Sequence, residues 1–121
     1  MFPIRNEHLT AFQKPLIDAF VRRMTQRLQT TFAEEVAGHG LRGEDLPAFV
    51  RRGIETARNY GVVNESDVEL YIECLVLFHP EFDRQPQFRR LGDVLRRPDW
   101  NGTAKMDYLY NYLVFETDKA R

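Results

Sequence analysis

The stretch VRRGIETARNYGVVNESDVELYI, residues 50–72, decides the fold class of this chain. Small residues recur in it at intervals of four, at Gly53, Ala57 and Gly61. That interval places them on one face of a helix, where another backbone can approach closely. Gly61 suits the position just past a helix end, and Asn64 followed by Asp67 resembles a capping box. The stretch therefore predicts two helices joined by a tight corner.

Helical spacing continues upstream of this corner. Apolar residues stand three and four apart from about Glu7 to Thr31, the pattern of one helical face. Pro15 interrupts the pattern and predicts a kink or break near Gln13, because its ring clashes with the carbonyl four residues earlier. A short helical turn from Phe32 to Ala37 then ends at the glycines of GHG, residues 38–40.

Downstream, the segment from Glu65 to Phe78 is apolar nearly all round in its second half, which predicts a central, buried helix. Cys74 lies there as a small buried hydrophobe. The loop HPEFDRQP, residues 79–86, follows, and in it Asp83 is expected to cap or to pair with Arg84. A short apolar-spaced helix comes next, carrying Phe88, Leu91, Val94 and Leu95.

The last segment fits two kinds of structure. Asn101-Gly102 predicts a turn before it. Its residues then alternate as on a strand, yet they also repeat with a helical period, which places Met106, Leu109, Tyr110 and Leu113 on one face. We favour a helix, since no second strand exists to pair with it. The expected fold is all-α, with residues 1–121 forming one compact single-domain bundle of five to six helices.

Composition limits the functional classes. The chain has 121 residues, 43% of them hydrophobic, which suits one globular domain. A net charge of −1 gives no general attraction to nucleic acid or membrane. No apolar run is long enough to cross a bilayer, and the start of the sequence lacks a secretory pattern. The sequence therefore predicts a cytoplasmic protein without a membrane partner.

Catalytic and metal-binding patterns are weak. His79, Glu81 and Asp83 lie within five residues, but a metal site needs ligands that converge from separate elements. We interpret them as a polar loop. The one serine, Ser66, has no nucleophile motif around it, and no phosphate-binding glycine loop is present. The expectation is a non-enzymatic protein with no catalytic residue, metal or cofactor.

Aromatic and arginine side chains are the better candidates for function. Tyr108, Tyr112 and Phe115 form a second stripe beside the apolar face of the last segment, and Trp100 precedes it. A second stripe is either a wider core or a binding surface, and aromatic and arginine residues anchor protein interfaces. The candidate partner-binding residues are Trp100, Tyr108 and Tyr112 as anchors, with Arg51, Arg52 and Arg58 as peripheral charges.

The chain resembles a family of small helical proteins encoded in bacterial type VI secretion and polymorphic-toxin loci. The resemblance spans about residues 4–113 and rests on four segments: IRNEHLTAF (4–12), VRRGIETARNYGVVNESDVELYI (50–72), PEFD (80–83) and MDYLY (106–110). Relatives in that family have a glycine before the PEFD equivalent, where this chain has His79. The resemblance implies a co-chaperone or adaptor that holds or loads a secretion effector, with the effector, its adaptor or the spike protein as partner.

Two alternatives remain open at this stage. An immunity protein would neutralise a cognate toxin by itself. A small DNA-binding regulator would use the helix–turn–helix corner with Arg51, Arg52 and Arg58, although the net charge makes nucleic acid a poor partner. The sequence does not determine the oligomeric state.

Overall fold

The computed structural model describes residues 14–119, which form six α-helices and two single-turn 3-10 helices, with no strand in this range. The helices are α1 (Lys14–Thr31), α2 (Ala33–Gly38), α3 (Asp45–Asn59), α4 (Glu65–Leu77), η2 (Phe82–Arg84), η3 (Pro86–Phe88), α5 (Arg89–Leu95) and α6 (Gly102–Lys119). The expected all-α class and bundle of five to six helices are confirmed for this part of the chain. The break expected near Gln13 lies outside the described residues.

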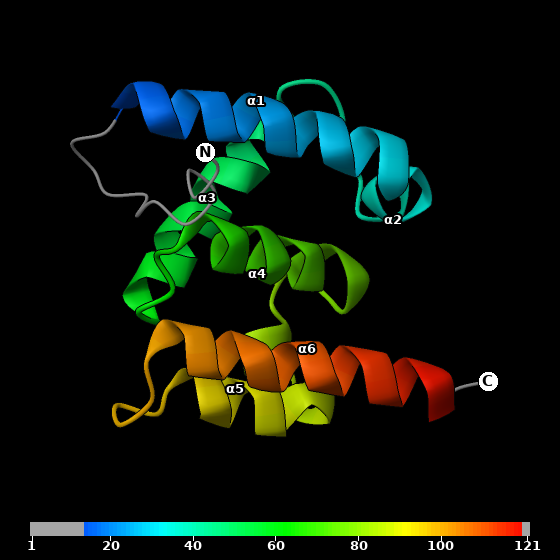
Figure 1. Ribbon diagram of the computed structural model, residues 1–121. Coiled ribbons are helices and arrows are strands. Elements are labelled where there is room, and N and C mark those ends of the chain that lie inside the picture. The colour runs from blue at the N-terminus through cyan, green and yellow to red at the C-terminus, as the bar shows by residue number, and fades with distance from the viewer. Residues whose placement is uncertain (1–13, 120–121) are drawn as a thin grey trace.

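Helix α4 forms the centre of the bundle (Figure 1). It packs against α3 and α2 on one side and against α6 on the other, and α1 packs against α2 and α3. Helix α5 lies beside α6 at the opposite end of the molecule from α1 (Figure 1). As the sequence predicts, α4 buries most of its side chains, including Tyr71, Ile72 and Cys74.

The corner between α3 and α4 is built by backbone hydrogen bonds. Gly61 has a φ of +80° just past the end of α3, a conformation that glycine adopts without steric cost. The N–H of Val62 donates to Ala57 O at 2.8 Å, and the N–H of Gly61 donates to Arg58 O at 2.9 Å. This pair of bonds is a Schellman motif, which satisfies the last carbonyls of the helix. The predicted position of Gly61 is confirmed.

The capping box expected at the start of α4 does not form. Asn64 occupies the N-cap position, but its side chain makes no capping hydrogen bond. Its amide lies 3.4 Å from Thr103 Oγ1, and the Thr103 hydroxyl donates to Asp67 at 2.8 Å. Asn64 and Asp67 therefore join α4 to α6 through Thr103, and the local sequence pattern does not predict this contact.

Two glycines allow close approach, one in the middle of α3 and one at the start of α6. A Cβ added to Gly53 would lie 2.8 Å from Ile72 Cγ1 of α4, so α4 packs closely on α3 at Gly53, although through a side chain and not through its backbone. Gly102, at the start of α6, packs directly against the backbone of Gly61 and Val62. Lys105 is buried beside this contact and donates to Tyr60 O at 2.8 Å. This carbonyl end of α3 carries a partial negative charge, which favours a cation.

Two local predictions differ from the structure, one at the start of the last helix and one in the loop of residues 79–86. Asn101-Gly102 does not form a free turn. Asn101 Oδ1 accepts from the N–H of Ala104 at 2.8 Å, so Asn101 caps α6 and Gly102 is the first residue of that helix.

Asp83 does not pair with Arg84. It accepts instead from the Tyr60 hydroxyl, while Arg84 pairs with Glu81 at 3.2 Å. No helix in the described range is long and apolar enough to cross a membrane.

Candidate functional site

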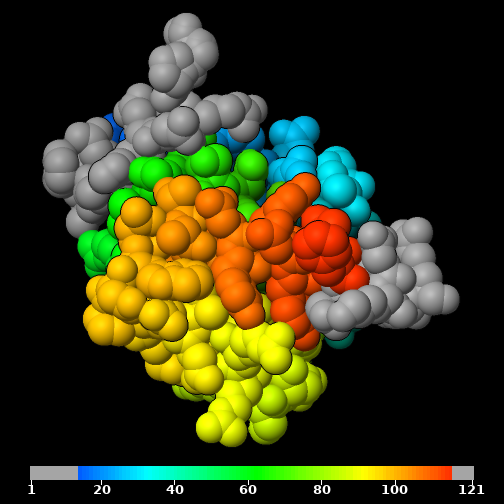
Figure 2. Space-filling model, turned by 60° about the horizontal axis from the view of Figure 1, so that its bottom comes forward, coloured from blue at the N-terminus to red at the C-terminus, as the bar shows by residue number. Residues whose placement is uncertain are grey.

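The outer surface of α6 carries the apolar side chains that the fold leaves in solvent. Among the described side chains, the exposed large hydrophobic ones are Tyr110, Val114 and Phe115. Their exposed fractions are 53%, 38% and 62%. Helix α6 crosses one face of the molecule (Figure 2). Met106 and Leu109 fill the buried side of the helix, so the expected place of Tyr110 on that buried face is wrong. Exposed apolar side chains gathered on one helix are typical of a protein-binding surface.

The three predicted anchors lie on or next to α6. Trp100 and Tyr108 are half-buried, with ring centroids 6.1 Å apart, and the Arg97 guanidinium carbon lies 4.8 Å above the Trp100 ring. Tyr112 packs edge-on against Phe78, with centroids 5.8 Å apart. Tyr112 therefore belongs largely to the wider core. Trp100 and Tyr108 keep part of their surface outward, as an anchor needs.

A shallow groove of about 440 Å³ runs beside Trp100 and Tyr108. Asp107 and Asn111 line it, and neither side chain forms a hydrogen bond or ion pair with the residues that the structure describes. Asp99 also lines it but is paired with Arg97 at 2.8 Å, which lowers the pKa of that carboxyl. A groove with aromatic walls and an unpaired carboxylate suits a basic side chain flanked by apolar ones.

The predicted arginines lie on α3, away from the exposed part of α6. Arg51 pairs with Asp18 of α1 at 2.9 Å, and Arg58 pairs with Glu55 at 2.6 Å. The guanidinium of Arg52 has no hydrogen bond or ion pair within the described range. All three are exposed, as expected. Within the described residues, no hydrogen bond, ion pair or ring contact joins these arginines to the aromatic anchors.

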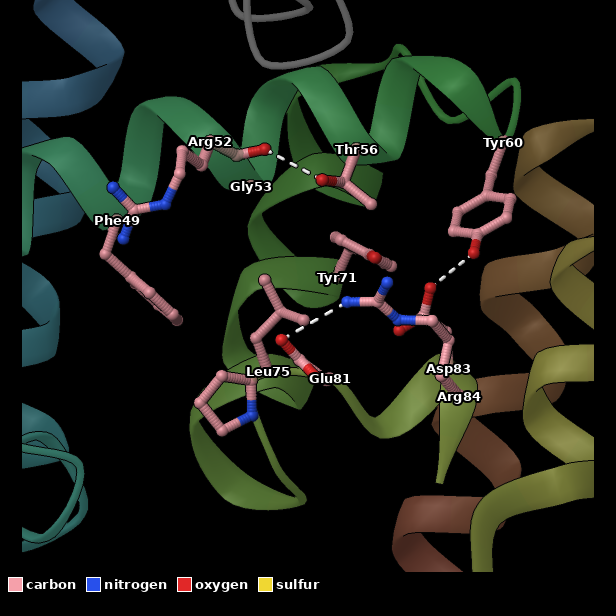
Figure 3. Close-up of a pocket in the computed structure, with 11 residues that line it drawn as sticks. Phe49, Arg52, Gly53, Thr56, Tyr60, Tyr71, Leu75, Glu81, Asp83 and Arg84 are labelled. Atoms are coloured by element: carbon pink, nitrogen blue, oxygen red, sulfur yellow. Dashed lines mark hydrogen bonds and ion pairs between the residues drawn. The ribbon is translucent and has the colours of Figure 1, made fainter. Parts of the chain in front are cut away.

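A second hollow lies between α3, α4 and the segment 80–84, and Figure 3 shows it in close-up. This cleft has a volume of about 500 Å³, within the range of small-molecule sites. Its lining residues are Phe49, Arg52, Gly53, Thr56, Tyr60, Tyr71, Leu75, Pro80, Glu81, Asp83 and Arg84. The lining mixes apolar surface with two arginines and two carboxylates, so the charges in the cleft balance.

Two tyrosines line the cleft, and their hydroxyl groups differ. Tyr60 donates its hydroxyl hydrogen to buried Asp83, and burial followed by this hydrogen bond raises the pKa of Tyr60 to about 12. Tyr71 is fully buried, and its hydroxyl oxygen has no hydrogen-bond partner in the described structure. Burial, then the charge of Asp83, raises the pKa of Tyr71, so it keeps its proton at neutral pH and stays a donor.

No metal or thiol chemistry is organised in the described residues. No group of three or more histidine, cysteine, aspartate or glutamate side chains there is placed to hold an ion, and His79 Nδ1 accepts from the N–H of Glu81 at 3.0 Å. Cys74 is fully buried, which raises the pKa of its thiol to about 12. A thiol in that state is a poor nucleophile.

No family model, curated protein or solved structure matches this chain. Sequence reasoning missed Tyr110 and Val114 as surface residues, because α6 is apolar around most of its circumference. It also missed the cleft. A tyrosine among the aliphatic residues of α4 was a usable signal, since a buried tyrosine hydroxyl normally finds a partner.

Proposed function

We propose that this protein is a non-enzymatic binding protein that holds or loads a type VI secretion effector in the cytoplasm. The observation that carries the proposal is the gathering of Tyr110, Val114 and Phe115 on the outer side of α6. The sequence resemblance over residues 4–113 supplies the class of partner: the effector, its adaptor or the spike protein.

The proposed contact has two parts. Apolar side chains of the partner would cover Phe115 and Tyr110, removing surface whose burial favours association. A basic side chain of the partner would enter the groove beside Trp100, where the carboxylate of Asp107 is unpaired with the described residues. Aromatic residues in this arrangement are the usual hot spots of protein interfaces.

The corner between α3 and α4 gives little support to DNA binding. In a DNA-binding corner the second helix enters the major groove. Here the second helix is α4, which is buried at the centre of the bundle. Arg51 and Arg58 are also neutralised by Asp18 and Glu55. A protein-binding surface on α6 needs none of these groups.

Co-expression with an effector encoded in the same locus tests the proposal. We expect a complex that persists through size-exclusion chromatography with the wild type and is lost with the double variant Tyr110→Ser/Phe115→Ser. Both positions are exposed, so the variant should fold, and its circular dichroism serves as the check. Neutralisation of the effector's toxicity by this protein alone would instead indicate an immunity protein. An intact complex with the double variant would refute the α6 surface.

A further inference from the structure

The cleft between α3, α4 and residues 80–84 contains a hydrogen-bond donor without an acceptor. The Tyr71 hydroxyl is buried in its wall, and no described atom accepts from it. Buried polar groups are nearly always paired in folded proteins, and an exception calls for a reason. Phenylalanine would fill the same space without this cost, so the hydroxyl points to a bound acceptor that completes the site.

Arg84 supplies a positive charge next to this donor. Its side chain extends across the cleft toward Tyr71, and its charge acts on the Tyr71 hydroxyl (Figure 3). The present partner of Arg84 is Glu81, at 3.2 Å, and both side chains are well exposed. An exposed ion pair of this kind contributes little stability, so an anionic ligand can replace Glu81 at little cost.

The remaining lining selects the class of ligand. Arg84 presents a guanidinium, and guanidinium groups match carboxylates with two parallel hydrogen bonds, whereas the Arg52 guanidinium lies beside Phe49 at the other end of the cleft (Figure 3). Glu81 and Asp83 place two negative charges in the same lining, which disfavours a dianion such as phosphate. Leu75 and Pro80 offer an apolar wall for the rest of the ligand.

We propose that this cleft binds a monocarboxylate with an apolar substituent, whose carboxylate accepts from the Tyr71 hydroxyl and from Arg84. The carboxylate belongs either to a free small acid or to the C-terminus of a peptide. This site is separate from the exposed surface of α6, and it does not depend on the function proposed for that surface.

Titration of the isotope-labelled full chain, followed by amide NMR shifts, tests this site. The probes are 4-methylpentanoate and acetyl-Ala-Leu with a free C-terminus, each compared with its uncharged amide. We expect saturable shifts at Gly53, Thr56 and Arg84 for at least one acid, with a dissociation constant of about 1 mM or below. The acid that binds more tightly identifies the source of the carboxylate. Equal binding of the matching amide would overturn the proposal.

Three variants separate binding from folding. Tyr71→Phe should weaken the acid about tenfold or more, while leaving the melting temperature unchanged or higher, because the lost hydroxyl has no partner in the protein. Arg84→Ala should weaken it to a similar extent. Arg58→Ala, whose arginine is on α3 outside the cleft, should bind like the wild type. No saturable shift with either acid at about 10 mM, or undiminished binding by Tyr71→Phe, would refute the site.

Discussion

Substitution of Gly102 by alanine tests the contact that positions α6. A Cβ at Gly102 would lie 2.9 Å from Val62 Cα and 3.0 Å from Gly61 C, and closer still to Gly61 O. These are backbone atoms of the α3–α4 corner, so no side chain can rotate away to relieve the clash. Overpacking of this kind costs about 3 kcal/mol at its upper range. Alanine recovers up to about 1 kcal/mol by restricting the unfolded chain, which leaves a net loss of about 2 kcal/mol.

Thermal unfolding followed by circular dichroism measures this loss. For a domain of this size, about 2 kcal/mol corresponds to a fall in melting temperature of about 8 °C. The matched control is Gly38→Ala at the end of α2, where an added Cβ meets nothing within 4 Å. That control should be neutral or slightly stabilising. If Gly102→Ala melts with the wild type, or if both variants lose equal stability, the close packing of α6 on the corner is refuted.

Three further results are expected. Cys74 should resist alkylation at pH 8 in the folded protein and react once the chain is unfolded, because burial raises its pKa to about 12; rapid reaction of the native protein would contradict this. In the folded protein the pKa values of Cys74 and Tyr60 are raised to about 12, above their ordinary values of 9.0 and 10.0. Their contribution to stability is therefore complete below about pH 9, and the free energy of unfolding should fall as the pH rises from about 9 to about 12. A free energy of unfolding that stays constant over this range in urea titrations would be inconsistent with the burial of these two groups. Arg23→Ala should lower the free energy of unfolding in urea by about 1 to 3 kcal/mol, because it leaves the buried carboxylate of Glu65 unpaired. Arg58→Ala removes an arginine from an exposed ion pair and should lower it by less than about 0.5 kcal/mol. Equal losses in the two variants would argue against the Arg23–Glu65 pair.

The sequence predicts most of the fold, because hydrophobic periodicity indicates the helices and glycine positions indicate where helices end. The spacing of small residues predicts Gly61 at the end of α3, and the nearly continuous apolar surface of α4 predicts its central position, and both are confirmed. The sequence predicts the wrong partner where a tertiary contact replaces a local one. Asn64 could have capped α4, but it reaches Thr103 on α6 instead, and no local pattern specifies that choice.

The candidate sites were less predictable than the fold. The sequence predicts that Tyr108 lies on the last helix and that Trp100 precedes it, and both positions are confirmed, but whether a side chain faces outward depends on which neighbours cover the helix. Tyr110 has the spacing of a core residue and is exposed, because the arc of α6 that α4 and α5 cover excludes it. The cleft depends on residues of α3, α4 and the 80–84 segment, which only the folded chain brings together.

The proposed function requires that the outer surface of α6 binds a secretion component. The most direct test is a pull-down of the tagged protein from its native cells, with the wild type and Tyr110→Ser/Phe115→Ser compared by quantitative mass spectrometry. We expect an effector, its adaptor or a spike protein to be recovered with the wild type and to be depleted about tenfold or more with the variant. Recovery of no secretion component, or equal recovery by both proteins, would contradict binding of such a component through α6.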